Sequence, residues 1–103
     1  MKISKLQKYE RLPNSIDYPR DEHGTPTAMI HESFLGRDFI PLENGLPIFT
    51  SYSGKTIRFG DEGYFPQRLL DEINSGREIV PFFIGESAYV EKGIAFITGI
   101  PVN

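Results

Sequence analysis

Residues 81–96 read PFFIGESAYVEKGIAF and place a polar insert between two apolar runs. Gly85 and Gly93 bracket the insert, and glycine permits the sharp backbone bends that a turn between strands requires. We therefore predict a strand, a tight polar bend and a second strand. The bend carries a carboxylate at Glu86, a phenol at Tyr89 and an ammonium at Lys92.

The residue types leave two interpretations of this bend open. Two buried strands could present Tyr89 rigidly to a ligand. Alternatively, Glu86 caps the bend and the ring of Tyr89 packs with its hydroxyl group satisfied, as buried tyrosines usually do. The residues alone favour the packing interpretation.

Short apolar segments separated by turn residues fill most of the remaining chain. Turn signals recur about every 8–12 residues, which is typical of a β-sandwich or barrel. We predict strands at residues 27–30, 46–52, 55–59, 79–84 and 94–100, the last ended by Pro101. For residues 1–17, apolar side chains spaced by three suit a helix, and a strand at about residues 5–12 is the alternative.

One helix interrupts this pattern, near residues 66–75. Pro66 suits the first turn of a helix, because its missing N–H would be unpaired there in any case. Leu69 and Ile73 fall on one helical stripe, and Gly76 stands where a C-terminal cap belongs. The fold class that we predict is all-β with this single short helix.

Length and composition point to one domain spanning residues 1–103. The net charge of −3 is too small to favour a nucleic acid or a membrane as partner. The absence of cysteine excludes disulfides and thiolate metal sites, and no segment has the apolar length of a membrane span. We expect a cytoplasmic protein.

The motifs that could carry chemistry are incomplete. His31-Glu32 would need a histidine at position 35 to bind zinc as in the His-Glu-x-x-His motif, and that position is Leu35. Gly54-Lys55-Thr56 lacks the glycine five residues earlier that a phosphate-binding loop requires, because that residue is Phe49. Lys55 on a tight hairpin invites comparison with biotin or lipoate carriers, although a solvated lysine is the commoner case. We expect no catalytic residue and no metal site within this chain.

Three runs together resemble one known family. They are DYPRDEHG at residues 17–24, AMIH at residues 28–31 and PFFIGESAYVEK at residues 81–92. The order of these runs and their residues resemble those of the C-terminal β domain of aspartoacylase, in the aspartoacylase and succinylglutamate desuccinylase family. The resemblance extends from about residue 9 to residue 98.

The resemblance implies a small barrel-sandwich hybrid and a part in the zinc-dependent hydrolysis of N-acyl amino acids such as N-acetylaspartate. In that family a separate catalytic domain holds the zinc and supplies the general base, while the C-terminal domain walls the channel to the site. The implied partners are that zinc domain, from the same or another chain, and a small anionic N-acyl amino acid. The chain alone is expected to be inactive. A stand-alone, non-catalytic binding or regulatory module on the same fold is the alternative.

Three residues take roles by matching the family's motif. The resemblance implies that Tyr89 binds substrate, which reverses the packing interpretation, and that Lys92 lies at the channel rim, where positive charge attracts an anion. Glu86 is expected to support the bend by hydrogen bonds, and Arg20 and Asp21 to form a structural turn. Residues 62–77 look longer than the family's usual connection and are expected to be an insertion.

Overall fold

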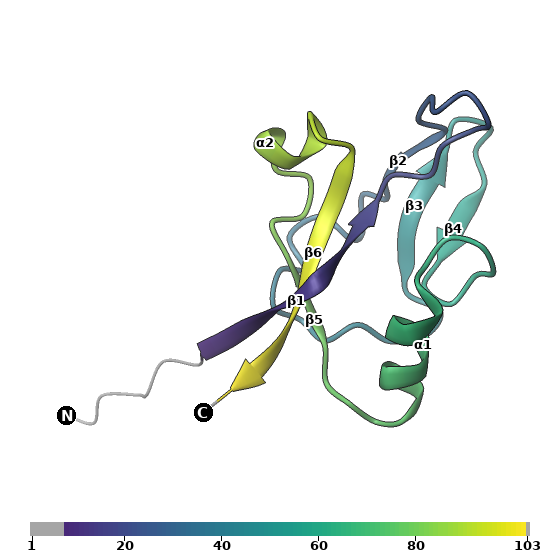
Figure 1. Cartoon of the computed structure of the whole chain (residues 1–103). Coiled ribbons are helices and arrows are strands. Elements are labelled where there is room, and N and C mark those ends of the chain that lie inside the picture. Colours follow the sequence, from purple (N-terminus) through teal and green to yellow (C-terminus); the bar gives the residue numbers. More distant parts are fainter. Residues whose placement is uncertain (1–7, 103) are drawn as a thin grey trace.

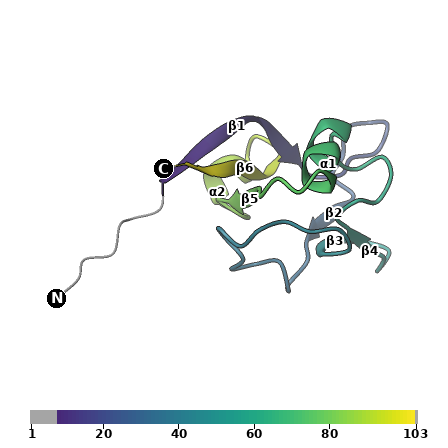
Figure 2. The same cartoon turned by 90° about the horizontal axis from the view of Figure 1, so that it is seen from below.

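Two three-stranded antiparallel sheets form the framework of residues 8–102, the part of the chain that this computed structural model describes (Figure 1). The first sheet has the strand order β1-β6-β5 and the second the order β2-β3-β4. The strands are β1 Lys8–Asp17, β2 Ala28–Ile30, β3 Pro47–Ser51, β4 Thr56–Arg58, β5 Val80–Phe82 and β6 Ile94–Val102. Two helices occur in these residues, α1 Gln67–Asn74 and α2 Ser87–Val90, and they are well separated in both ribbon views (Figures 1 and 2).

The long pairing of β1 with β6 joins the two ends of the described chain. Its register runs from Lys8 opposite Val102 to Asp17 opposite Ile94. Of the two alternatives for residues 1–17, the strand is therefore confirmed from Lys8 onward and the helix is wrong there, and residues 1–7 lie outside the described residues. Pro13 does not end the strand, because the register shifts between Arg11 and Ser15 and a proline is tolerated at such an irregularity.

The remaining predicted strands are confirmed with small changes at their ends. The main difference is in β6, which continues through Pro101 to Val102 and does not stop at the proline. Its partner β5 pairs only as far as Gly99, so Pro101 lies in a two-stranded part of the sheet, where a missing N–H disturbs fewer hydrogen bonds.

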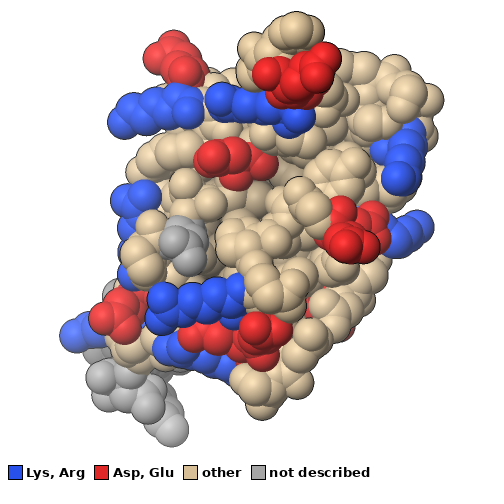
Figure 3. Space-filling view, turned by 45° about the vertical axis from the view of Figure 1, so that its right-hand side comes forward, with Lys and Arg blue, Asp and Glu red and all other residues tan. Residues whose placement is uncertain are grey.

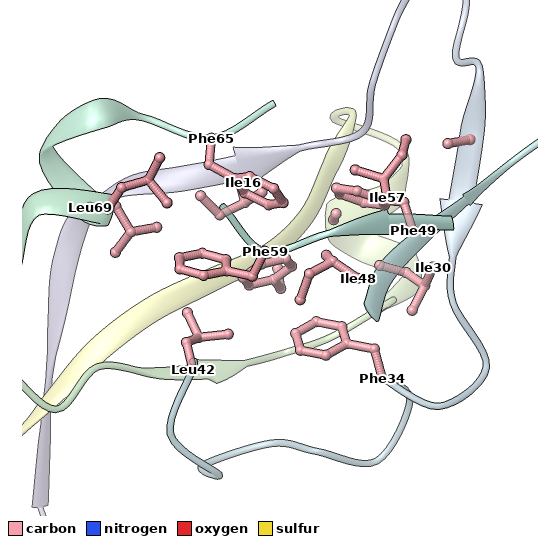
Figure 4. Packing of buried hydrophobic residues seen from close by; sticks show 14 of the residues in the cluster. Ile16, Ile30, Phe34, Leu42, Ile48, Phe49, Ile57, Phe59, Phe65 and Leu69 are labelled. Carbon is pink, nitrogen blue, oxygen red and sulfur yellow. The ribbon is translucent and has the colours of Figure 1, made fainter. Parts of the chain in front are cut away.

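The hydrophobic core lies between the two sheets and beneath α1. Side chains from β1, β3, β4 and α1 point toward one another there (Figure 4). Phe34, Phe49 and Phe96 have 0% exposure, and burial of each such side chain contributes about 1.5–3 kcal/mol relative to exposure. The packing of both sheets on one core agrees with an all-β sandwich.

The predicted helix near residues 66–75 is confirmed as α1. Pro66 is its N-cap residue, with φ −59°, and Leu69 and Leu70 turn into the core. Gly76 follows the C-cap residue Ser75 with φ 96°, and its N–H donates to the carbonyl oxygen of Ile73 at 3.0 Å. A glycine takes this left-handed position without steric cost.

The polar insert between Gly85 and Gly93 contains a short helix and is not a simple tight bend. After β5 the chain turns at Phe83, which has φ 56°, and then forms the one-turn helix α2 before Gly93 and β6. This helix was not predicted, because four residues are too few to show a helical period.

The surface carries mixed charge on the face that Figure 3 shows, where lysine and arginine side chains lie among acidic ones. Neither helix of residues 8–102 has the length and apolarity that crossing a membrane demands.

Candidate functional site

The three residues predicted for the site lie together on and beside α2. Tyr89 is half-buried, whereas Glu86 and Lys92 are exposed. Main-chain hydrogen bonds hold the turn: the N–H of Tyr89 donates to the carbonyl of Glu86 at 3.0 Å, and the N–H of Lys92 donates to the carbonyl of Tyr89 at 2.9 Å. The structure therefore brings the phenol, the carboxylate and the ammonium to one end of the first sheet.

The ring of Tyr89 lies between an aromatic ring and a cation. It stacks on Phe83 with a centroid separation of 5.6 Å and an interplanar angle of 20°. The Nζ atom of Lys92 lies 6.0 Å from the ring centroid, at the limit of a cation–π interaction. Within residues 8–102, none of the four α2 residues is buried. The phenol is thus supported on the surface, not packed into the interior.

This arrangement suits recognition of an anion. A phenol can donate a hydrogen bond to a carboxylate, and the ammonium of Lys92 supplies positive charge on the same turn. Glu86 supports the turn through its main-chain carbonyl, which accepts from the N–H groups of Tyr89 and Val90. Within the described part of the chain its side chain makes no hydrogen bond that caps α2, and the bracing of the bend by its carboxylate stays a prediction.

The α2 turn rests on the turn of residues 17–24. The N–H of Tyr18 donates to the carbonyl of Gly93 at 3.0 Å, and the guanidinium of Arg20 lies against the Cα of Gly93. Asp21 organises its own loop, because its Oδ1 accepts from the N–H groups of His23 at 2.9 Å and Thr25 at 3.0 Å. The run at residues 17–24 and the end of the run at residues 81–92 are therefore neighbours in space, and Asp21 has a structural role.

A groove of about 240 Å³ lies on the other side of this contact. It is lined by Tyr18, Pro26, Ala28, Met29, Tyr52, Val90 and Gly93. Burial raises the pKa of the Tyr18 phenol, and nearby Tyr52 raises it further. The sequence analysis missed this groove, since it joins residues from both ends of the chain.

Two further residues near Tyr89 were also missed. Phe83 supplies the ring beneath the phenol, and Asp38 accepts a hydrogen bond from the N–H of Phe83 at 2.9 Å. Two consecutive phenylalanines, Phe82 at the end of β5 and Phe83 after it, were a signal that the strand's alternation ends there. Asp38 gave no local signal, because its partner is 45 residues away.

The two histidines lie apart from this turn. The Nδ1 atom of His31 is 2.8 Å from the hydroxyl of Ser33 and accepts the N–H of the same residue at 3.1 Å. His23 is exposed beside Glu22. Across residues 8–102, no three His, Asp or Glu side chains are grouped to hold a metal ion.

Lys55 is exposed on the turn between β3 and β4. The N–H of Lys55 donates to the hydroxyl of Ser51, and its carbonyl accepts the N–H of Ser51. These hydrogen bonds give the residue a structural part in the hairpin.

Comparison with known proteins points to one family. A family model described as the AstE/AspA barrel-sandwich hybrid domain matches residues 6–67. A protein named "Probable aspartoacylase" from Prochlorococcus marinus is 42% identical over 81 residues, which are 79% of this chain and 23% of that protein. The N-acyl-aromatic-L-amino acid amidohydrolase (carboxylate-forming) A of Danio rerio is 42% identical over 83 residues, 80% of this chain and 21% of that protein.

A solved structure agrees with these relatives. The crystal structure of murine aminoacylase 3 superposes with a TM-score of 0.71 at 29% identity, covering 94% of this chain and 27% of that one. The chain spans about a quarter of the length of the relatives it matches. The family model ends where α1 begins, and the insertion at residues 62–77 stays a prediction.

The resemblance found in the sequence and the barrel-sandwich fold are thus confirmed. By their names, these relatives are hydrolases of the aspartoacylase and aminoacylase kind. The chain belongs to the AstE/AspA barrel-sandwich hybrid domain family, the family of the aspartoacylase C-terminal domain.

Proposed function

We propose that this chain is the non-metal domain of a zinc-dependent amidohydrolase that hydrolyses N-acyl amino acids. In this proposal Tyr89 donates a hydrogen bond to a carboxylate of the substrate, and Lys92 attracts the anion at the channel rim. The observation that carries the proposal is the placement of the Tyr89 phenol, stacked on Phe83 at 5.6 Å and left half-exposed at the end of a sheet.

Family membership supplies the reaction class. A relative from Danio rerio is named as an amidohydrolase of N-acyl-aromatic-L-amino acids that forms a carboxylate. Hydrolysis of such an amide releases a carboxylate and a free amino acid, so the substrate and both products carry a carboxylate group. A surface that offers one neutral donor and one cation fits that chemistry, because charge-assisted hydrogen bonds to carboxylates are short and strong.

The metal does not fit the described residues of this chain. Nδ1 of His31 already accepts a hydrogen bond from Ser33, and residues 8–102 contain no group of three metal-binding side chains. The proposal therefore places the zinc and the general base in a catalytic domain, of the same or another chain. This chain's own part is to bind and orient the substrate.

A deacylase assay tests the proposal. The complete enzyme carrying Tyr89→Phe is compared with the unsubstituted enzyme on an N-acyl amino acid. We expect kcat/KM to fall by an amount equivalent to about 1–3 kcal/mol, the loss of one hydrogen bond to a charged group. Tyr64→Phe is the matched control, because Tyr64 is 37% exposed and stands three residues before α1 in the sequence, and α1 is well separated from α2 (Figure 1).

The assay also separates this proposal from its rival. The 103-residue chain alone is expected to show no deacylase activity, and adding the zinc domain is expected to produce it. Unchanged kinetics in Tyr89→Phe would remove Tyr89 from the site. A failure of the zinc domain to associate with the chain would favour the stand-alone binding module.

A further inference from the structure

Phe83 has a backbone conformation that its own side chain disfavours. Its φ of 56° is in the left-handed region, where a bulky residue is uncommon. Such conformations persist when the surrounding structure determines them, and they are concentrated at functional sites. The residue is also 43% exposed, so burial of its ring does not account for the conformation.

A carboxylate holds this conformation in place. The Oδ2 atom of Asp38 accepts the N–H of Phe83 at 2.9 Å, within the range of a charge-assisted hydrogen bond. The next residue, Phe39, donates its N–H to the carbonyl of Pro81 at 2.7 Å. Asp38 and Phe39, from a loop far away in the sequence, thus hydrogen-bond to the end of β5 where the chain turns toward α2.

The turn brings the ring of Phe83 beneath Tyr89. In a continuing strand, successive side chains alternate between the two faces of the sheet, and adjacent rings would point apart. Here Phe82 and Phe83 are in contact, with centroids 5.4 Å apart, and Phe83 is nearly parallel to Tyr89 at 5.6 Å and 20°. The left-handed residue therefore ends the alternation and provides a flat support for the phenol.

We infer that Asp38 and Phe83 are positioning residues for Tyr89. Asp38 fixes the backbone of Phe83, and the Phe83 ring sets the plane of the Tyr89 ring and so the direction of its hydroxyl group. The substrate-directed part of this inference rests on the proposed function, whereas the orientation of the ring is a property of this chain alone.

Phe39 provides a matched control. It is also a phenylalanine with positive φ, 65°, it is 47% exposed, and it stacks on Phe82 at 5.5 Å. Through Phe82 it belongs to the same set of contacting rings as Phe83. Among the described residues, however, its ring makes no contact with the ring of Tyr89. Phe39→Leu therefore reproduces the chemical change of Phe83→Leu without removing the support.

The first test is nuclear magnetic resonance on the 103-residue chain. We expect cross-relaxation between the Phe83 and Tyr89 rings, and an upfield ring-current shift of the Tyr89 ring protons. Phe83→Leu and Asp38→Ala should reduce that shift, whereas Phe39→Leu should leave it unchanged. Asp38→Asn keeps an acceptor oxygen and should restore most of it. A Tyr89 shift that is the same in Phe83→Leu as in the unsubstituted chain would overturn the inference.

The second test is a double-mutant cycle in the complete enzyme. Phe83→Leu should lower kcat/KM by up to about a hundredfold, the scale expected when a substrate-binding group is misplaced, and should have no further effect in a Tyr89→Phe background. An equal loss in both backgrounds would show a general structural role and overturn the inference. If Tyr89→Phe alone changes nothing, the proposed function fails, and the resonance measurement still decides the orientation.

Discussion

The guanidinium of Arg20 occupies the space that a side chain at Gly93 would need. Gly93 also has φ 79°, and its carbonyl accepts the N–H of Tyr18 at 3.0 Å. Two residues of the run at residues 17–24 therefore contact the glycine that directly follows the run at residues 81–92. This contact holds the turn that carries Tyr89 against residues 18–20.

Gly93→Ala should destabilise the chain by about 1–2 kcal/mol from its left-handed backbone alone, with a further loss because Arg20 must move. Gly24→Ala is the control, since Gly24 has φ 80° and no described atom lies within 4 Å of a Cβ built there. Chemical denaturation measures both free energies of unfolding. The excess for Gly93→Ala should disappear in an Arg20→Ala background, and an excess that remains would contradict the contact.

Asp21→Ala should destabilise the chain by about 1 kcal/mol, because two main-chain N–H groups lose their acceptor. Asp21→Asn keeps one acceptor oxygen and should lose less. Glu22→Ala is the control: Glu22 is exposed and lies 3.5 Å from the exposed His23, so a change of less than about 0.5 kcal/mol is expected. Equal midpoints of denaturation for Asp21→Ala and Glu22→Ala would exclude a structural role for Asp21.

Local patterns predicted most elements of this fold. Pro66, the stripe that includes Leu69, and Gly76 lie within one short segment, and together they located α1 correctly. The short strands were predictable for the same reason, since turn residues and β-branched or aromatic side chains lie next to one another in sequence. The family was predictable because several runs of residues have sequences that are specific to it.

Long-range partners explain what the sequence could not show. The pairing of β1 with β6 joins residues at opposite ends of the described chain. Because of that pairing, residues 8–17 form a strand and not a helix. The one-turn helix α2 is too short to show a period. The left-handed conformation of Phe83 depends on Asp38, 45 residues earlier, and no local pattern reports such a contact.

Tyr18 should make stability depend on alkaline pH. Burial and nearby Tyr52 raise its pKa above the ordinary 10.0, so the folded state holds the phenolic proton more tightly than the unfolded state does. The contribution of the protonated Tyr18 phenol to the free energy of unfolding is therefore complete below pH 10. That contribution is lost as the pH rises through the higher, folded-state pKa. Denaturation between pH 9 and pH 11 should show a smaller decline in Tyr18→Phe than in the unsubstituted chain. The difference between the two proteins, and not the decline itself, is diagnostic, and equal declines would refute the assignment.

Lys92→Gln should raise the KM of the complete enzyme for an anionic N-acyl amino acid, with kcat little changed, because in the proposed function this exposed cation attracts substrate at the channel rim without taking part in the bond cleavage. The effect should be largest at low salt and shrink as salt is added, since the Debye length falls from about 30 Å at 0.01 M to about 10 Å at 0.1 M.

Arg68→Gln is the control for net charge, because Arg68 is exposed on α1, which is well separated from α2 (Figure 1). Steady-state kinetics across a salt series measure both variants. A salt-independent rise in KM, or an equal rise in Arg68→Gln, would show that Lys92 does not act as a local attractor of the substrate.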